Sequence, residues 1–247
     1  AEGAGGVDQI SKKSLPDSVR AGRMQRILRR RLEKLPPGDI RPLRLAAVQG
    51  RRIDAAVLAK LAPELDLERW VRTGIDAAVL ERKDGAVRFA HDKLREELLG
   101  ELSADDRRAL HAEVAAGIEA VHGATSERHA ALAMHHAGAG NAAEEARYVT
   151  LAGETALLHG AHQEAVVLLS RALALSSSVP PLERARLHNQ LGYAQFFLMD
   201  FARAEPSFRA AAREAGVEIP VTGRLGFLLR QMMVQAAHRV RGVEAAF

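Results

Sequence analysis

The chain has 247 residues, of which 47% are hydrophobic, enough to bury the core of one large domain or of two ordinary ones. It contains no cysteine, which excludes disulfides, thiolate metal sites and thiol nucleophiles and favours a reducing, cytoplasmic location. The formal net charge of +4 is small for this length and does not by itself indicate a nucleic-acid partner.

A membrane partner or an export signal is not expected. The sequence has no run of about 18 or more apolar residues, and its start lacks the basic-then-apolar order of a secretory signal. Because residue 1 is Ala rather than Met, we expect a processed chain or a piece of a longer one. Residues 1–14 are expected to form a flexible tail.

Residues 18–35 predict an amphipathic basic helix. An apolar stripe (Val19, Ile27, Leu28, Leu32, Leu35) runs beside basic residues spaced three or four apart, at Arg20, Arg23, Arg26, Arg29, Arg30, Arg31 and Lys34. Pro36 and Pro37 should end this helix. Its charged face either contacts phosphate, with Arg26 and Arg30 as candidates, or is simply solvated, as charged helix faces usually are.

Three short helices and a hairpin are expected next. Their patterns cover residues 39–50, 53–63 and 66–80, and each segment is too short to be stable alone. Asp84 and Gly85 then lie between two short apolar and β-branched runs, which predicts a tight β-hairpin over residues 79–89. Three helices and a two-stranded wing are the winged-helix arrangement, expected over residues 40–102.

The third helix of a winged-helix domain often reads DNA, but here it is a poor candidate. It offers Arg69 and Arg72 against three carboxylates, those of Asp66, Glu68 and Asp76. We therefore expect a winged helix that packs against protein. The alternative is a nucleic-acid-binding transcriptional regulator with phosphate contacts in the basic helix and in the wing, at Arg82, Lys83 and Arg88, whose affinity would fall steeply with salt.

From residue 103 onward the sequence predicts helices almost throughout, beginning with Ser103 as an N-cap. Two segments align at a distance of 39 residues, pairing Gly153 with Gly192, Ala165 with Ala204, Leu169 with Phe208, and Ala172 with Ala211. Small residues that let two antiparallel helices approach, with a larger one between them, are the tetratricopeptide pattern. A weaker copy with Ala146 at the small position precedes them, and a divergent helix with Met232 and Met233 follows.

The chain thus has a basic helix, a winged-helix pattern and helical repeats, in that order, and its most specific motif is "FAHDKLREEL" followed by "SADDRRALH". The order resembles the region after the nucleotide-binding core in bacterial signal-transduction ATPases of the STAND class, which are fused to serine/threonine kinases, class III adenylate cyclases or maltose-activator-like regulators. The resemblance covers residues 14–245. It implies that residues 15–36 end the helical lid of the ATPase, that 40–102 form its winged-helix domain and that 103–247 form its sensor and scaffold superhelix.

His91 and Asp92 are nucleotide-sensing candidates by the same resemblance. In related nucleotide-switch ATPases a Met-His-Asp motif lets its His approach the ADP phosphate, and Phe89-Ala90-His91-Asp92 is similar, with Ala in place of Met. An imidazole can donate to a phosphate oxygen, and Asp92 can cap the helix that follows. The alternative is that His91 is half-buried and only ties the wing to that helix.

No catalytic, cofactor or metal site is expected within this chain. It has no G-x-x-x-x-G-K-[ST] loop, so ATP or ADP with magnesium would bind in the intact parent only. A G-x-S-x-G motif is also absent, and Ser176, Ser177 and Ser178 lie in a connector. Adjacent histidines on a helix point about 100° apart, which argues against a metal site among His129, His135, His136, His159 and His162.

We therefore expect an all-α protein with a small β-hairpin wing: a winged-helix domain followed by a tetratricopeptide-like superhelix. It would be a non-enzymatic regulatory fragment whose winged helix packs on an upstream nucleotide-binding domain. The superhelix would bind a protein or peptide through the first helices of its repeats. Candidate contacts there are Glu154, His188, Tyr193 and Gln195.

Overall fold

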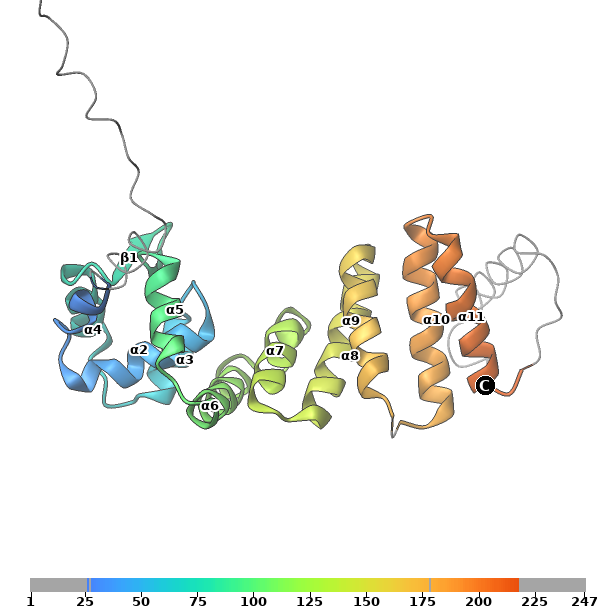
Figure 1. Ribbon diagram of the computed structural model, residues 1–247, viewed down its shortest axis with the longest axis horizontal. Helices are drawn as coiled ribbons and strands as arrows, with labels where there is room; N and C mark the ends of the chain where they lie inside the picture. The colour runs from blue at the N-terminus through green and yellow to red at the C-terminus, as the bar shows by residue number, and fades with distance from the viewer. Residues whose placement is uncertain (1–25, 27, 178, 218–247) are drawn as a thin grey trace, which may run out of the picture. The chain divides into compact units, whose positions relative to one another are not determined.

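The computed structural model describes residues 26, 28–177 and 179–217. They are mostly helical with one small two-stranded antiparallel sheet, which confirms the expected fold class in this coarse form. The chain divides into two compact units, Ala1–Gly117 and Ile118–Phe247, which are considered separately (Figure 1). The tail 1–14, residues 18–25 and 27 of the basic helix, and the helix with Met232 and Met233 lie outside the described residues.

The first unit contains the short helices and the hairpin that the sequence predicts. In chain order the elements are α2 (Pro37–Gln49), α3 (Ala55–Leu61), α4 (Leu67–Asp76), β1 (Leu80–Lys83), β2 (Ala86–Phe89) and α5 (Asp92–Gly100). The next helix, α6 (Ala104–His122), begins in this unit. The preceding helical residues stop at Leu32, earlier than the expected end just before Pro36, and Pro37 is the first residue of α2.

Local signals place the ends of these elements. The Asp54 carboxylate accepts from the backbone N–H groups of Ala56 and Val57, and Ser103 Oγ accepts from Asp106 N at 3.0 Å. Asp84 and Gly85 both have positive φ, 52° and 73°, as a two-residue type I′ hairpin turn requires. The strands pair in the matching register, from Leu80 opposite Phe89 to Lys83 opposite Ala86.

The hairpin has a third, shorter neighbour that the sequence did not predict. Ile53 N donates to Val87 O at 3.0 Å, and Phe89 N donates to Arg51 O at 3.3 Å. β2 therefore has β1 on one edge and the residues around Arg52 on the other. This bridge attaches the hairpin to the segment just before α3.

α4 ends earlier than the sequence pattern predicts. It stops at Asp76 because Ala78 adopts a positive φ of 53°, and Val79 N then bonds back to Gly74 O at 2.8 Å. Trp70 and Val71 are buried in the core, whereas Ile75 is 39% exposed. A side chain at Gly74 would collide with Leu80, so the glycine lets β1 start directly against α4.

A buried carboxylate joins α2 to α4. Asp39, in the first turn of α2, is only 2% exposed, and its two oxygens accept from Arg69 at 2.7 and 3.1 Å. The indole Nε1 of the neighbouring Trp70 donates to the Asp39 carbonyl at 3.3 Å. Since a buried carboxylate is costly unless it is paired, this contact fixes how α4 packs against α2.

The second unit is a series of antiparallel neighbours. After a short 3-10 turn, η1 (Ser126–Arg128), come α7 (His129–Ala139), α8 (Ala142–Leu158), α9 (His162–Leu175), α10 (Pro181–Phe197) and α11 (Phe201–Glu214). Each of α7 to α11 packs against the next, as Figure 1 shows. The residues paired at 39-residue spacing occupy equivalent places, with Ala165, Leu169, Ala204 and Phe208 all buried.

The weaker preceding copy is not a separate unit. α8 is one continuous helix, and it packs both against α7 and against α9. The segment expected as the second helix of one copy is thus also the first helix of the next. Ala146, expected at a close-packed position, is only half-buried.

Candidate functional sites

A groove of about 440 Å³ lies between α8 and α10. α8 contributes Glu154, Leu157 and Leu158 to its wall, and α10 contributes Arg186, Asn189, Gln190 and Tyr193. These two helices are the first members of the α8–α9 and α10–α11 pairs. The groove therefore lies on the helices where the sequence predicts partner contacts.

Polar contacts cross this groove. Glu154 Oε1 accepts from Gln190 Nε2 at 3.0 Å and also from the Arg186 guanidinium. The Nε2 of the Gln190 amide is thus committed to Glu154, which leaves Oε1 as its other hydrogen-bonding atom. That Oε1 atom is a buried acceptor left without a hydrogen-bond partner.

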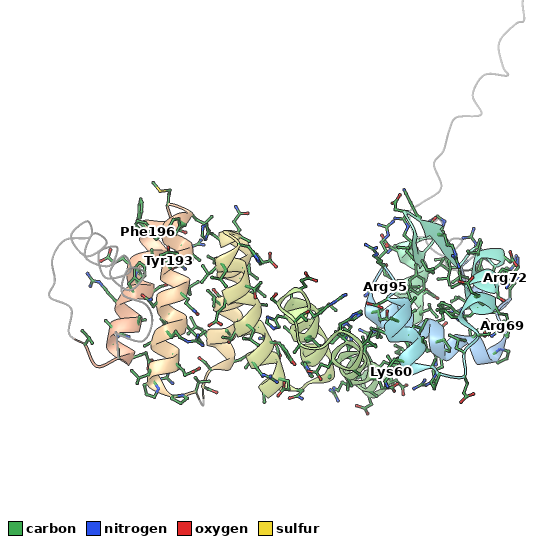
Figure 2. The ribbon with its side chains drawn as sticks, turned by 180° about the vertical axis from the view of Figure 1, so that it is seen from behind. Lys60, Arg69, Arg72, Arg95, Tyr193 and Phe196 are labelled. Carbon is green, nitrogen blue, oxygen red and sulfur yellow. The ribbon has the colours of Figure 1, made fainter. Side chains whose placement is uncertain are left out.

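Beside these polar residues and Asn189, the groove is lined by two leucines, Leu157 and Leu158, and by the aromatic ring of Tyr193. Leu158 is 85% exposed, although leucine is usually at least partly covered. Tyr193 packs on Phe197 with ring centroids 4.6 Å apart, and His162 stacks on the same ring at 4.8 Å. Figure 2 shows Tyr193 and Phe196 together on α10. An apolar wall beside a few oriented polar atoms is typical of a peptide-binding surface.

The four predicted partner-binding residues separate into two groups. Glu154 and Tyr193 line the groove, whereas His188 is half-buried outside it. Gln195 was wrongly expected to face a partner: it is buried, and its Oε1 accepts from Ser207 Oγ of α11 at 2.7 Å. Arg186 and Gln190 also line the groove and were not predicted, although their spacing from Tyr193 along one helix face could have identified them.

His91, the nucleotide-sensing candidate, is exposed at the N-cap position of α5. The alternative of a half-buried tie to the wing is therefore wrong. The tie is made by the backbone, where Ala90 N donates to Val79 O at 3.0 Å. The imidazole makes no capping hydrogen bond to the helix. The imidazole is therefore not used to cap α5 and is accessible to a group of another molecule.

Asp92 does not cap α5 as expected. It is the first residue inside the helix, and its Oδ1 lies 3.3 Å from Arg51 Nε in an exposed ion pair. An acid in the first turn still complements the positive end of the helix. Of the two candidates, only His91 is thus placed to interact with another molecule without first breaking an ion pair.

Three of the basic residues considered for nucleic acid are engaged by carboxylates. On α4, Arg69 is held by Asp39, while Arg72 is exposed (Figure 2). On the wing, Arg82 binds both oxygens of Glu68 at 2.9 Å, and Arg88 binds Glu81 at 2.6 Å. The other candidate phosphate contacts, which are Arg26, Arg30 and Lys83, are exposed.

Comparisons of the chain with protein-family models, with curated proteins and with solved structures found no match. Within the described part of the chain, every helix is too short or too polar to span a lipid bilayer.

Proposed function

We propose that the chain is a non-catalytic regulatory and scaffold part of a cytoplasmic signal-transduction ATPase. Residues 40–102 form its winged-helix domain, which packs on a nucleotide-binding domain, and the helices from residue 103 onward form a tetratricopeptide-like superhelix. The observation that carries the proposal is the groove between α8 and α10, which combines an apolar and aromatic part (Leu157, Leu158, Tyr193) with an unpartnered buried acceptor, Gln190 Oε1.

The occupant of the groove is a protein segment or peptide. Gln190 Oε1 accepts a backbone N–H of the peptide, and Leu157, Leu158 and Tyr193 cover an apolar side chain. Glu154 and Arg186 neutralise each other across the groove, so strong attraction to a highly charged ligand is not expected. Binding would bias the parent protein between a resting and an active state.

His91 supports the nucleotide-switch part of the proposal. Its exposed imidazole at the start of α5 is able to donate to a phosphate oxygen of ADP held by the neighbouring nucleotide-binding domain. ATP, ADP and magnesium are then cofactors of the parent and not of this chain.

The groove is tested by selecting peptides from a displayed random library on the purified chain and measuring their affinities by calorimetry. Tyr193→Ala and Gln190→Ala should each weaken binding by about 10-fold or more, since a few central residues carry most of the energy of an interface. Glu164→Ala, at an exposed site on α9, is the matched control and should have no effect. Equal affinity in all variants would contradict the groove assignment.

The nucleotide switch is tested by titrating ADP and ATP with magnesium into this chain and into a longer chain that carries the upstream sequence. Only the longer chain should bind, and His91→Ala should weaken its ADP affinity. Tight binding by the short chain would contradict the proposal. Duplex DNA binding that falls steeply with salt would instead favour a winged-helix nucleic-acid-binding regulator.

A further inference from the structure

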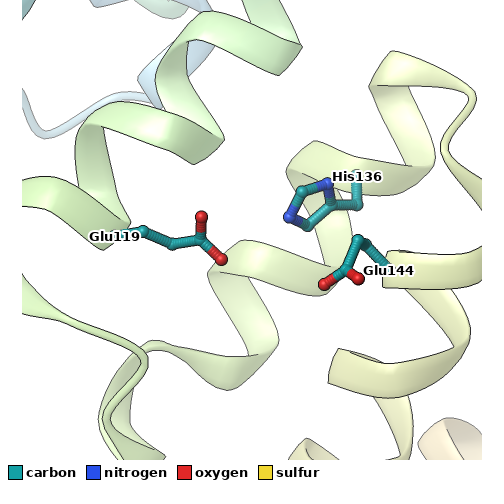
Figure 3. Close-up of side chains that lie close together, drawn as sticks. All are labelled: Glu119, His136 and Glu144. Carbon is teal, nitrogen blue, oxygen red and sulfur yellow. The ribbon is translucent and has the colours of Figure 1, made fainter.

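Two carboxylates and an imidazole, from three different helices, lie together in the second unit. Glu119 comes from α6, His136 from α7 and Glu144 from α8, and one potential ligand atom of each lies within 4.8 Å of the other two. Figure 3 shows the three side chains converging on one place between the helices. The cluster is separate from the groove between α8 and α10.

The imidazole of His136 has an unused nitrogen. Its Nε2 is buried and has no hydrogen-bond partner, which is costly for a polar atom unless something else binds it. The ring is also held in orientation, because it stacks on Tyr148 with centroids 5.4 Å apart and planes only 3° from parallel. An oriented, unpartnered imidazole nitrogen is what a metal ion requires of a histidine ligand.

Both carboxylates are held by neighbouring donors. The buried Tyr148 hydroxyl donates to Glu119 Oε1, and Arg147 Nη1 donates to Glu144 Oε2 at 3.1 Å. Arg147 in turn lies over the Tyr148 ring, 5.0 Å from its centroid. Hydrogen-bonded carboxylates of this kind recur around metal ions, where the outer contacts keep the ligand oxygens in place.

We propose that Glu119, His136 and Glu144 bind a divalent transition-metal ion of the Zn²⁺ type. One imidazole nitrogen and two carboxylate oxygens are ligands that Zn²⁺ accepts, with water in the fourth position. Mg²⁺ and Ca²⁺ prefer sites made of oxygen alone, so the histidine favours the transition metal.

The spacing of the three ligand atoms is compatible with one bound ion. Ligand atoms about 2.0–2.2 Å from one tetrahedral ion lie roughly 3.3–3.6 Å from each other, inside the 4.8 Å limit within which the three atoms lie here. Glutamate side chains have three rotatable bonds, so rotation of Glu119 and Glu144 adjusts this spacing without a shift of the helices. The ion would then cross-link α6, α7 and α8.

The experiment uses the full chain freed of metal by chelator and titrated with ZnCl₂ in a calorimeter, with MgCl₂ and CaCl₂ titrated in parallel. We expect one Zn²⁺ per chain and no comparable heat from Mg²⁺ or Ca²⁺. His136→Ala and Glu144→Gln should each weaken Zn²⁺ binding by about 10-fold or more. Helical circular dichroism of each variant verifies that it is folded.

Two controls separate the cluster from unspecific binding at surface histidines and acids. His159→Ala removes an exposed histidine at the end of α8, and Glu127→Gln removes an exposed carboxylate in η1. Both should leave Zn²⁺ affinity unchanged. The absence of Zn²⁺ binding, or equal loss in the controls and in His136→Ala, would overturn the proposal.

Cobalt gives a second readout that does not depend on the size of the heat signal. Co²⁺ in a site with four or five ligands absorbs visible light more strongly than the hexaaqua ion. The wild-type chain should therefore develop a visible band at one equivalent of Co²⁺, and Glu144→Gln and Glu119→Gln should lose it. A spectrum identical to that of free Co²⁺ would contradict the site.

Discussion

Gly192 on α10 and Phe208 on α11 are in such close contact that a Cβ at position 192 would lie 2.8 Å from two ring atoms of Phe208. The same relationship holds one helix pair earlier, where a Cβ at Gly153 would lie 2.9 Å from Leu169 Cδ2. Both large side chains are buried. In each pair, the missing side chain on the first helix makes room for the large residue of the second.

Gly192→Ala should therefore destabilise the protein by about 1–3 kcal/mol, even though alanine is the better helix former by about 1 kcal/mol. Urea unfolding followed by circular dichroism measures this. Phe208→Leu in the same background should reduce the cost, because the smaller side chain relieves the collision. Gly38→Ala, at a position with open space, is the control. Unchanged or higher stability of Gly192→Ala would contradict the packing.

The turn between α10 and α11 contains a strained residue. Met199 has a φ of 61° and is 70% exposed, and the equivalent position in the turn between α8 and α9 is Gly160, with a φ of 73°. Since this conformation costs an L-residue about 1–2 kcal/mol, Met199→Gly should raise the free energy of unfolding by roughly 0.5–1 kcal/mol. Met199→Ala, which keeps the strain, should not. A less stable glycine variant would show that Met199 contributes packing.

Tyr148 should make the second unit sensitive to alkali. Burial, together with the hydrogen bond to Glu119, raises its pKa to about 12 from the ordinary value of 10. A raised folded-state pKa gives stability that is complete below pH 10 and is lost as the pH rises toward 12. Tyr148→Phe should lose about 1–3 kcal/mol at neutral pH and then decline less between pH 10 and 12. Urea unfolding across this range tests it, and equal slopes would refute it.

His188 should give the opposite response on the acid side. Burial lowers its pKa below 6.5; Arg184 and Arg213 act in the same direction, and Glu214 opposes them. A lowered pKa of a base gives stability that is present above pH 6.5 and is lost as the pH falls through the folded-state value. His188→Gln should therefore lose less stability than the wild type on acidification from pH 6.5. His159→Gln, at an exposed site, should follow the wild type; identical curves for all three would refute the assignment.

Several features were determined by the sequence alone because their causes are local. The Asp84-Gly85 turn, the Ser103 cap and the helix pairing around Leu169 and Phe208 were all predicted and are present. A turn or a cap depends on the conformations of a few neighbouring residues. The apolar spacing along a helix likewise determines which face is buried, whatever it is buried against.

Contacts between different helices were decided by the tertiary structure. The sequence pattern did not indicate that Asp39 is held by Arg69, that Gln195 bonds to Ser207, or that Glu119 and Glu144 meet His136. A metal site was not expected from the sequence, because only histidines close together in the chain were compared. Carboxylates on other helices, such as Glu119 and Glu144, were not considered. Which side chains meet depends on how each helix is rotated about its axis and how closely it approaches the next, and both are set by core packing over the whole unit.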